Sequence, residues 1–247
     1  MKKIAVINYK GGSGKTTTVA NLAHGLTLKG HKVLMIDTDP QGSLGFYFNI
    51  NPEKTLYDLL INKTPSDECI QKVRHNLDMI CSNERVFPAE IKLAKTKERE
   101  LVLKNKLRQV KDYDYIIVDC APSMNLLNQN ALLFADEIVI PVSMEYLSLI
   151  GVKQLLKNIK IINRIFKKTI IINRVIPTFF DIKSKKSKDI SMSLRRVFPN
   201  MISRPVRTSQ YLSEAPSNRK TIFEYAPNSK VAEDYFEIVK ELINDEK

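Results

Sequence analysis

The sequence predicts an α/β protein with a doubly wound, mostly parallel sheet that carries helices on both faces. Three observations support this prediction. Short apolar runs of strand length recur along the chain, amphipathic helical patterns separate several of them, and the glycine-rich segment KGGSGKTTT lies between the first apolar run and the first helical pattern. A glycine-rich loop in that place is typical of a P-loop nucleotide-binding fold.

Six runs have the length and composition of strands: residues 4–8, 33–37, 77–81, 115–119, 137–142 and 169–173. Each is continuously apolar rather than alternating between apolar and polar residues. Continuous apolar runs indicate strands covered on both faces, which is the arrangement found in parallel sheets.

Helical patterns lie between these runs. After the glycine-rich segment, apolar residues recur at helical spacing (Val19, Leu22, Ala23 and Leu26), and Gly30 is placed to end that helix. Further helices are predicted over residues 101–110 and 232–243. Residues 181–188 (DIKSKKSK) are polar and charged without periodicity, so we expect an exposed, mobile loop there.

Composition restricts the class of protein. The 247 residues are 43% hydrophobic and 27% charged, which is ordinary globular composition and excludes a disordered chain. With no internal repeat and no glycine- or serine-rich linker, we expect one domain over residues 1–247, without a helix-turn-helix module before the P-loop. The three cysteines, Cys69, Cys81 and Cys120, show no metal-binding spacing and favour a reducing cytosol. No segment has the length of a membrane helix, so a cytoplasmic location is expected.

The positive charge is concentrated in one segment. The chain carries a formal net charge of +12. Residues 151–220 contain 17 Lys and Arg against three acids, a balance of +14, so the remaining residues sum to −2. Such a segment indicates a polyanionic partner, either nucleic acid or an anionic membrane surface, although a solvated basic face is the simpler alternative.

The phosphate loop itself is residues 10–17, KGGSGKTT. It fits the pattern GxxxxGK[ST] only if Lys10 takes the place of the first glycine, so it is a deviant Walker A motif. Backbone N–H groups and the helix N-terminus would bind phosphate, Lys15 would neutralise charge, and the Thr16 hydroxyl would ligate Mg²⁺. The predicted nucleotide contacts are Gly11, Gly12, Ser13, Gly14, Lys15, Thr16 and Thr17.

Four segments resemble the ParA/Soj branch of the ParA/MinD ATPases: KGGSGKTTT, VLMIDTDPQG, YDYIIVDCAPS and the C-terminal LSEAPSNRKTIFEYAPNSKVAEDYFEIVKELI. The resemblance therefore runs nearly end to end. It implies a P-loop ATPase that forms a face-to-face homodimer on ATP, binds double-stranded DNA non-specifically as that dimer, and is released when a ParB-like centromere-binding partner stimulates hydrolysis.

The resemblance also assigns roles to single residues. Lys10 matches the lysine that reaches the phosphates of the other subunit, and Lys15 matches the lysine that binds phosphate in its own subunit. Asp39 matches the residue that orients the attacking water, Asp37 would bind a magnesium-bound water, and Asp119 matches the Walker B aspartate. The three acids follow or end buried strands, where ligands bind in open α/β sheets. Slow, switch-like turnover is expected.

The adenine contact predicted from the resemblance is Asn173-Arg174, which would end the strand of residues 169–173, with the loop of residues 203–208 covering the other side of the base. A turn-forming Asn at a strand end is the simpler alternative. The chain departs from the family nearby, because Tyr211 stands where relatives have an arginine often used on DNA, which puts that contact in doubt.

Non-specific binding to the DNA backbone through Lys and Arg is the expected use of the basic segment. The candidate residues are Lys183, Lys185, Lys186, Lys188, Arg195, Arg196, Arg207, Arg219 and Lys220, with Arg204 in the same segment. Lys183 aligns with a DNA-facing position of the family.

Other functions fit the sequence less well. A related ATPase that positions a non-DNA cargo on the nucleoid stays open. A MinD-like regulator would need a basic amphipathic C-terminal helix for the membrane, whereas residues 233–247 are net acidic. A nitrogenase-reductase-like electron carrier would need two suitably placed cysteines, and only Cys120 beside Asp119 has a fitting context. A metabolic P-loop enzyme would need a substrate pocket that the sequence does not reveal.

Overall fold

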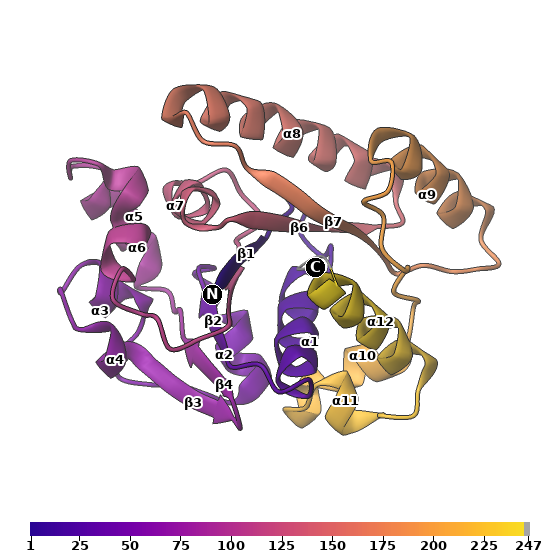
Figure 1. Cartoon of the computed structure of the whole chain (residues 1–247), viewed down its shortest axis with the longest axis horizontal. Coiled ribbons are helices and arrows are strands. Elements are labelled where there is room, and N and C mark those ends of the chain that lie inside the picture. Colours follow the sequence, from indigo (N-terminus) through magenta and orange to yellow (C-terminus); the bar gives the residue numbers. More distant parts are fainter. Residues whose placement is uncertain (245–247) are drawn as a thin grey trace.

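The computed structural model describes residues 1–244 and contains one seven-stranded sheet, in the order β3-β4-β2-β5-β1-β6-β7 (Figure 1). Asp245 to Lys247, the last part of the acidic C-terminal stretch, lie outside the described residues. Six strands are parallel: β1 (Lys2–Val6), β2 (Val33–Asp37), β4 (Leu77–Ile80), β5 (Tyr115–Asp119), β6 (Glu137–Ser143) and β7 (Ile171–Thr178). The predicted doubly wound sheet is confirmed.

One edge strand was not predicted. The strand β3 (Ile70–Arg74, IQKVR) pairs antiparallel with β4 and is only partly buried. A short edge strand needs few apolar side chains, because one of its sides and part of its faces meet water. Its sequence therefore lacks the continuous apolar run that marks the parallel strands.

Helices cover both faces of the sheet, and alternate strand residues face the two layers. One core cluster contains Ala5 and Ile7 of the first strand segment, and the other contains Ile4 and Val6. The first cluster packs under α3 (Leu56–Leu60), α4 (Ser66–Cys69), α5 (Val86–Leu93), α6 (Val102–Lys106), α7 (Leu126–Phe134), α8 (Tyr146–Phe166) and α9 (Lys185–Val197). The second packs under α1 (Lys15–Thr27), α2 (Ser43–Phe48), α11 (Ile222–Tyr225) and α12 (Lys230–Asn244), next to α10 (Gln210–Glu214).

The helix predicted over residues 101–110 is shorter than expected: a single 3₁₀ turn, η1 (Arg99–Leu101), leads into α6, which ends at Lys106. The second 3₁₀ turn is η2 (Pro216–Asn218), between α10 and α11. The helix predicted over residues 232–243 is confirmed by α12.

The expected mobile loop at residues 181–188 is wrong in its second half, because α9 begins at Lys185. The Ser184 side chain caps this helix and accepts a hydrogen bond from the Ser187 N–H at 3.3 Å. The apolar residues that anchor α9, Ile190 and Leu194, lie beyond the lysine-rich stretch. The apolar residues that reveal the helical period therefore come only after the predicted loop, although the helix begins within it.

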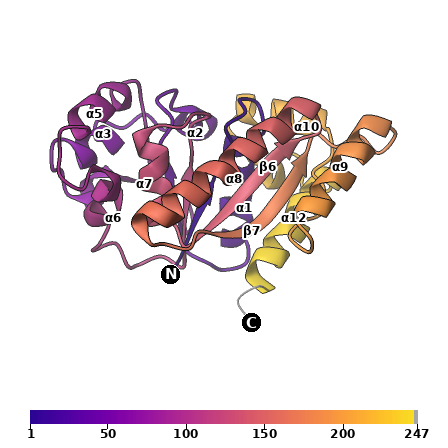
Figure 2. The same ribbon diagram turned by 90° about the horizontal axis from the view of Figure 1, so that it is seen from above.

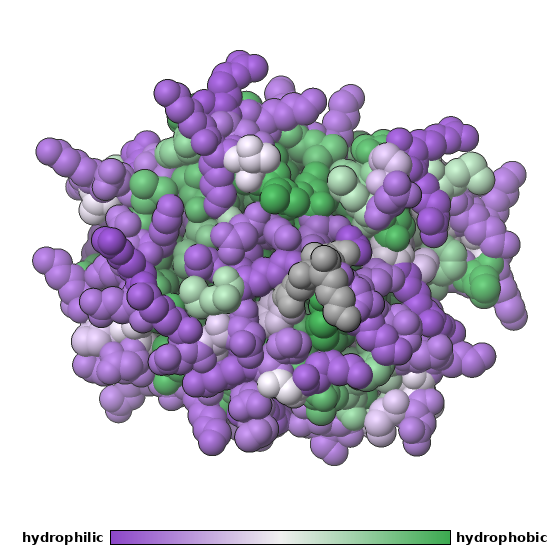
Figure 3. Space-filling view, viewed as in Figure 1, coloured by the Kyte–Doolittle hydropathy of each residue, from purple (hydrophilic) through white to green (hydrophobic). Residues whose placement is uncertain are grey.

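Figure 2 looks onto α8 and α9, which lie side by side over β6 and β7. Figure 3 shows that hydrophilic side chains cover most of the face seen in Figure 1, and that apolar side chains gather there in separate patches. Within residues 1–244, no helix combines the length and apolarity that a bilayer crossing requires.

The three cysteines are free and buried. Burial raises the pKa of the Cys69 thiol to about 11 and that of Cys81 to about 12. Burial, together with the charge of Asp119, also raises the pKa of Cys120. These thiols therefore stay protonated near neutral pH.

Candidate nucleotide site

The P-loop follows β1 and opens α1 at the carboxyl edge of the sheet. Gly12 and Gly14 have φ of 71° and 84°, a backbone conformation that glycine adopts without strain. A Cβ added at Gly11 or Gly12 would meet no atom within 4 Å. The space beside these two glycines is therefore open, so phosphate oxygens can approach the backbone N–H groups of the loop.

Lys15 is the first residue of α1 and is buried. Its Nζ donates to the Lys10 carbonyl at 3.4 Å. Burial lowers the pKa of Lys15, and the nearby carboxylates of Asp119 and Asp39 act in the opposite direction. Across the part of the chain that the structure describes, Lys15 forms no ion pair, so its ammonium group is suited to bind an incoming phosphate.

Asp37 and Asp119 end neighbouring strands and are partners in the β2–β5 register. Asp119 is 1% exposed, and within the described chain neither of its carboxylate oxygens has a hydrogen-bond partner. Burial raises the pKa of Asp119 to about 7, although Thr16 and Lys15 lower it. A buried carboxylate without partners is costly unless a cation joins it. The donor set of Asp119 and the Thr16 hydroxyl therefore fits a hydrated Mg²⁺ ion.

Asp37 has a structural task as well. Its two oxygens accept hydrogen bonds from the backbone N–H groups of Asp39, at 2.9 Å, and of Leu44, at 3.1 Å. Burial and the charge of Asp119 raise its pKa well above the ordinary value. Asp37 thus fastens the turn that follows β2, and its contact with a magnesium-bound water stays a prediction.

Asp39 lies in that turn, where one of its oxygens accepts a hydrogen bond from the Gln41 N–H at 3.0 Å. Its side chain is partly exposed and close enough to Lys15 to raise the pKa of that lysine. The structure thus brings together Lys15, Thr16, Asp39 and Asp119, as the sequence predicts.

The Lys10 side chain contacts the end of β6 and the start of α8. Its Nζ forms an ion pair with Glu145, at the start of α8, and lies 3.4 Å from the Ser143 Oγ. Glu145 was missed in the sequence, because it lies 135 residues from Lys10 and in no motif. The pairing leaves the phosphate-binding concavity to Lys15.

The prediction that Asn173-Arg174 ends its strand is wrong. The strand β7 continues to Thr178, so Asn173 lies five residues, about 16 Å, from the carboxyl edge. Asn173 donates a hydrogen bond to Glu137 at 2.7 Å, and Arg174 pairs with Glu241 at 3.4 Å. These contacts place neither side chain at the P-loop.

A cavity of about 630 Å³ adjoins the P-loop instead. The end of β7 forms part of it, since the Thr178 hydroxyl donates to the Ser13 carbonyl at 2.9 Å. Its lining is Gly14, Thr17, Thr178, Phe179, Val206, Arg207, Thr208, Ser209, Gln210, Leu212, Ser213, Pro216 and Tyr235. The cavity lies beside the P-loop, where a base and ribose would fit. Three of its lining residues, Val206, Arg207 and Thr208, belong to the loop of residues 203–208 that the sequence predicts to cover the base.

The predicted DNA contacts fall into three groups. Lys183, Lys185, Lys186, Lys188, Arg195 and Arg196 are exposed on or just before α9. Arg219 and Lys220 are exposed between η2 and α11, and α11 lies at the bottom of Figure 1, whereas α9 lies at the upper right.

The third group is paired with a buried acid of the protein. Arg207 binds the buried Asp234 through its Nε at 2.6 Å and a terminal N–H at 2.7 Å, and Arg204 binds the same carboxylate at 3.0 Å. Arg207 therefore forms a wall of the nucleotide cavity, and its ion pair with Asp234 competes with any role on DNA.

The fold and the residues gathered at the carboxyl edge of the sheet define a P-loop nucleotide-binding protein with a deviant Walker A loop. The model of a family described as an AAA domain matches residues 1–172. The sporulation initiation inhibitor protein Soj of Bacillus subtilis is 38% identical over 98% of both chains, and the chromosome-partitioning ATPase Soj of Treponema pallidum is 33% identical over 98% of this chain and 97% of its own. The chain belongs to the ParA/Soj family of P-loop ATPases.

A solved structure agrees on the fold. Cobyrinic acid a,c-diamide synthase from Mycobacterium smegmatis, with bound ATP analogue and magnesium, is 27% identical and matches with a TM-score of 0.85, covering 99% of this chain and 95% of that one.

Proposed function

We propose that this chain is an ATP-dependent partition ATPase, which uses ATP and Mg²⁺ to form a dimer that binds DNA. One observation carries the proposal: the nucleotide loop and the basic helix share a cavity. Gly12 of the P-loop and Lys186 of α9 line the same cavity of about 350 Å³, together with Glu145. A nucleotide in the loop therefore lies beside the helix that holds most of the predicted DNA contacts.

The chemistry is transfer of the terminal phosphoryl group to water. The P-loop N–H groups and Lys15 bind and orient the phosphates, and Thr16 and Asp119 hold Mg²⁺, which neutralises phosphate charge when bound. Asp39 is placed to orient the attacking water. Positioning and charge stabilisation account for most catalysis in this reaction class, so this small set is sufficient.

In the proposed dimer, Lys10 of each copy adds a positive charge at the phosphates bound by the other copy. Lys10 is tied to Glu145 within its own chain, and we propose that it leaves this pair to reach the phosphates of a second copy. Tyr146, Leu147 and Ile150 expose apolar side chains on the first turns of α8, directly after Glu145. Exposed apolar groups beside the nucleotide edge favour a face that a second copy covers.

DNA is the proposed partner of the α9 surface, bound through backbone phosphates and without sequence preference. The proposal includes a single domain, a location on the nucleoid, and a ParB-like partner that stimulates hydrolysis. The sequence likeness to the chromosome-partitioning ATPase Soj of Treponema pallidum supports it.

Two variants test the proposal. Asp39→Ala should retain ATP and elute as a persistent dimer in size-exclusion chromatography with ATP, because only water positioning is lost. Lys15→Ala should bind no ATP and remain monomeric. Near-wild-type hydrolysis in Lys15→Ala, or a monomeric Asp39→Ala, would contradict these roles.

A further inference from the structure

The long helix α8 carries a row of positive charge that the predicted DNA contacts do not include. Four basic residues, Lys153, Lys157, Lys160 and Arg164, lie at positions i, i+4, i+7 and i+11 of this helix. That spacing puts them on one side of the helix. We call this row the α8 stripe. The 21 residues of α8 contain no Asp or Glu.

Within the described residues the α8 stripe has no counter-charge. All four side chains are exposed, and across residues 1–244 none of them has an acidic group within ion-pair distance. Like charges three or four residues apart destabilise a helix by about 0.2–0.5 kcal/mol per pair. An ordinary solvated helix face interleaves acids with bases, so this row is complementary to an external polyanion.

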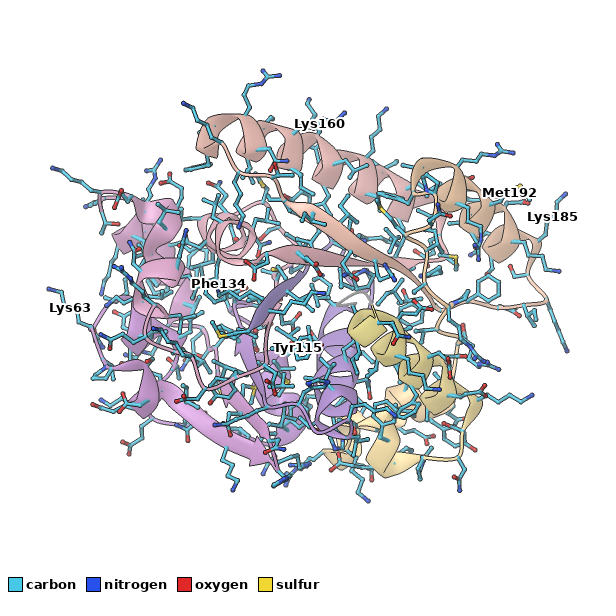
Figure 4. The ribbon with its side chains drawn as sticks, in the orientation of Figure 1. Lys63, Tyr115, Phe134, Lys160, Lys185 and Met192 are labelled. Atoms are coloured by element: carbon cyan, nitrogen blue, oxygen red, sulfur yellow. The ribbon has the colours of Figure 1, made fainter. Side chains whose placement is uncertain are left out.

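The stripe lies beside the basic side of α9. Figures 1 and 2 both place α8 next to α9 on the same face of the sheet, and in Figure 4 Lys160 and Lys185 extend outward from these helices. The exposed basic residues of α9 are Lys185, Lys186, Lys188, Arg195 and Arg196, and the only exposed acid of that helix is Asp189. The two helices thus carry their exposed basic residues on the same side of the sheet.

We propose that the α8 stripe is a second phosphate-binding row, which holds the backbone of a DNA duplex alongside the contacts made by α9. The stripe is about 16 Å long, at about 1.5 Å per residue. The inference rests on the proposed function and extends its DNA surface.

The position of the stripe suits a dimer. It begins three residues after Ile150, the last of the exposed apolar residues named above, and continues along α8 away from the nucleotide edge. The apolar face of α8 that contains Val152, Leu155 and Ile159 is buried against the sheet. Because Ile161 and Ile165 of the same helix are exposed, the test below includes lipid vesicles as well as DNA.

The test compares two triple variants that remove equal charge. One removes Lys153, Lys157 and Lys160 from the stripe by substitution with Ala. The matched control removes Lys95, Lys97 and Lys111, which are exposed in another part of the chain. Affinity for two unrelated duplexes is measured by fluorescence anisotropy at several salt concentrations, with a non-hydrolysable ATP analogue.

The stripe variant should lose about 0.9 in the slope of log K against log salt for each lost contact, about 2.7 in total, and on the order of 10²-fold in affinity at 0.15 M salt. The control should keep the wild-type slope. A triple Lys→Gln variant, which keeps side-chain length, should behave as the Ala variant does.

Three results would overturn the inference. Equal slopes in the stripe and control variants of a DNA-binding wild type would refute the stripe and leave the proposed function standing. A wild type without salt-dependent DNA binding would refute the proposed function itself. Loss of binding to phosphatidylglycerol vesicles in the stripe variant, with DNA binding unchanged, would assign the stripe to a membrane.

Discussion

Asp234 is the single carboxylate on which the two arginines beside the nucleotide cavity converge, and Asp234→Asn tests its role. The residue lies on α12 and is 0% exposed. It accepts hydrogen bonds from Arg207 at 2.6 and 2.7 Å and from Arg204 at 3.0 Å. The substitution keeps the volume of the side chain and removes its charge, so any loss reports the ion pairs rather than a cavity.

The expected loss follows from burial. Removing one partner of a buried ion pair costs about 3–5 kcal/mol in the free energy of unfolding. The side chains of Arg204 and Arg207 are 35% and 37% exposed, so water can replace part of what they lose. We therefore expect the lower end, about 3 kcal/mol. For a chain of this size that corresponds to a fall in Tm of about 6–12 °C.

The assay is urea denaturation with thermal melting, and Glu233→Ala is the matched control. Glu233 binds the same Arg204 at 3.1 Å, but its side chain is 57% exposed. An exposed pair contributes about 0–1 kcal/mol, so the control should stay close to wild type. A second readout is nucleotide affinity, which should fall in Asp234→Asn because Arg207 lines the cavity. An Asp234→Asn variant with the same Tm as the Glu233→Ala control would refute the reasoning.

Three further predictions concern other parts of the chain. Burial lowers the pKa of His24, so the unfolded state gains the proton first as pH falls below about 6.5. The free energy of unfolding should therefore decrease as pH falls below that value, by up to about 1.4 kcal/mol per pH unit. Denaturation of His24→Gln at several pH values should lack this decrease. Gly25→Ala would place a Cβ 2.6 Å from the Val239 side chain. It should lower the free energy of unfolding by about 1–3 kcal/mol, offset by about 0.5–1 kcal/mol from the better helix propensity of Ala. The loss should be smaller in a Val239→Ala background, whereas additive losses would show that the two side chains do not touch. Lys10→Ala should keep ADP affinity while losing partner-stimulated hydrolysis, and equal loss of ADP affinity in Lys10→Ala and Lys15→Ala would show that both lysines act within one chain.

The parallel strands and the P-loop were predictable because their signals are local. A buried strand such as Tyr115–Asp119 must be apolar up to the acid that ends it, and the loop requires its glycines, Lys15 and Thr16 in one short stretch. The positions of the acids follow directly, since the carboxyl ends of parallel strands meet at one edge.

The errors arose where a local pattern was interrupted. The strand β7 contains Asn173, Arg174 and Pro177, so its apolar run ends before the strand does. An edge strand tolerates such residues, because part of its backbone needs no partner. Contacts between distant residues, such as Lys10 with Glu145 and Arg207 with Asp234, leave no trace in spacing.

The buried thiols make this chain convenient for site-specific labelling. A maleimide reacts with thiolates that it can reach, and the native fold offers it none near neutral pH, because Cys69, Cys81 and Cys120 are buried and hold their protons. A cysteine introduced at Lys160 would then be the one position in the described chain to take a dye, on the surface proposed to meet DNA. In denaturant the same reagent would find three native thiols, so the extent of labelling would count unfolded molecules in the same tube.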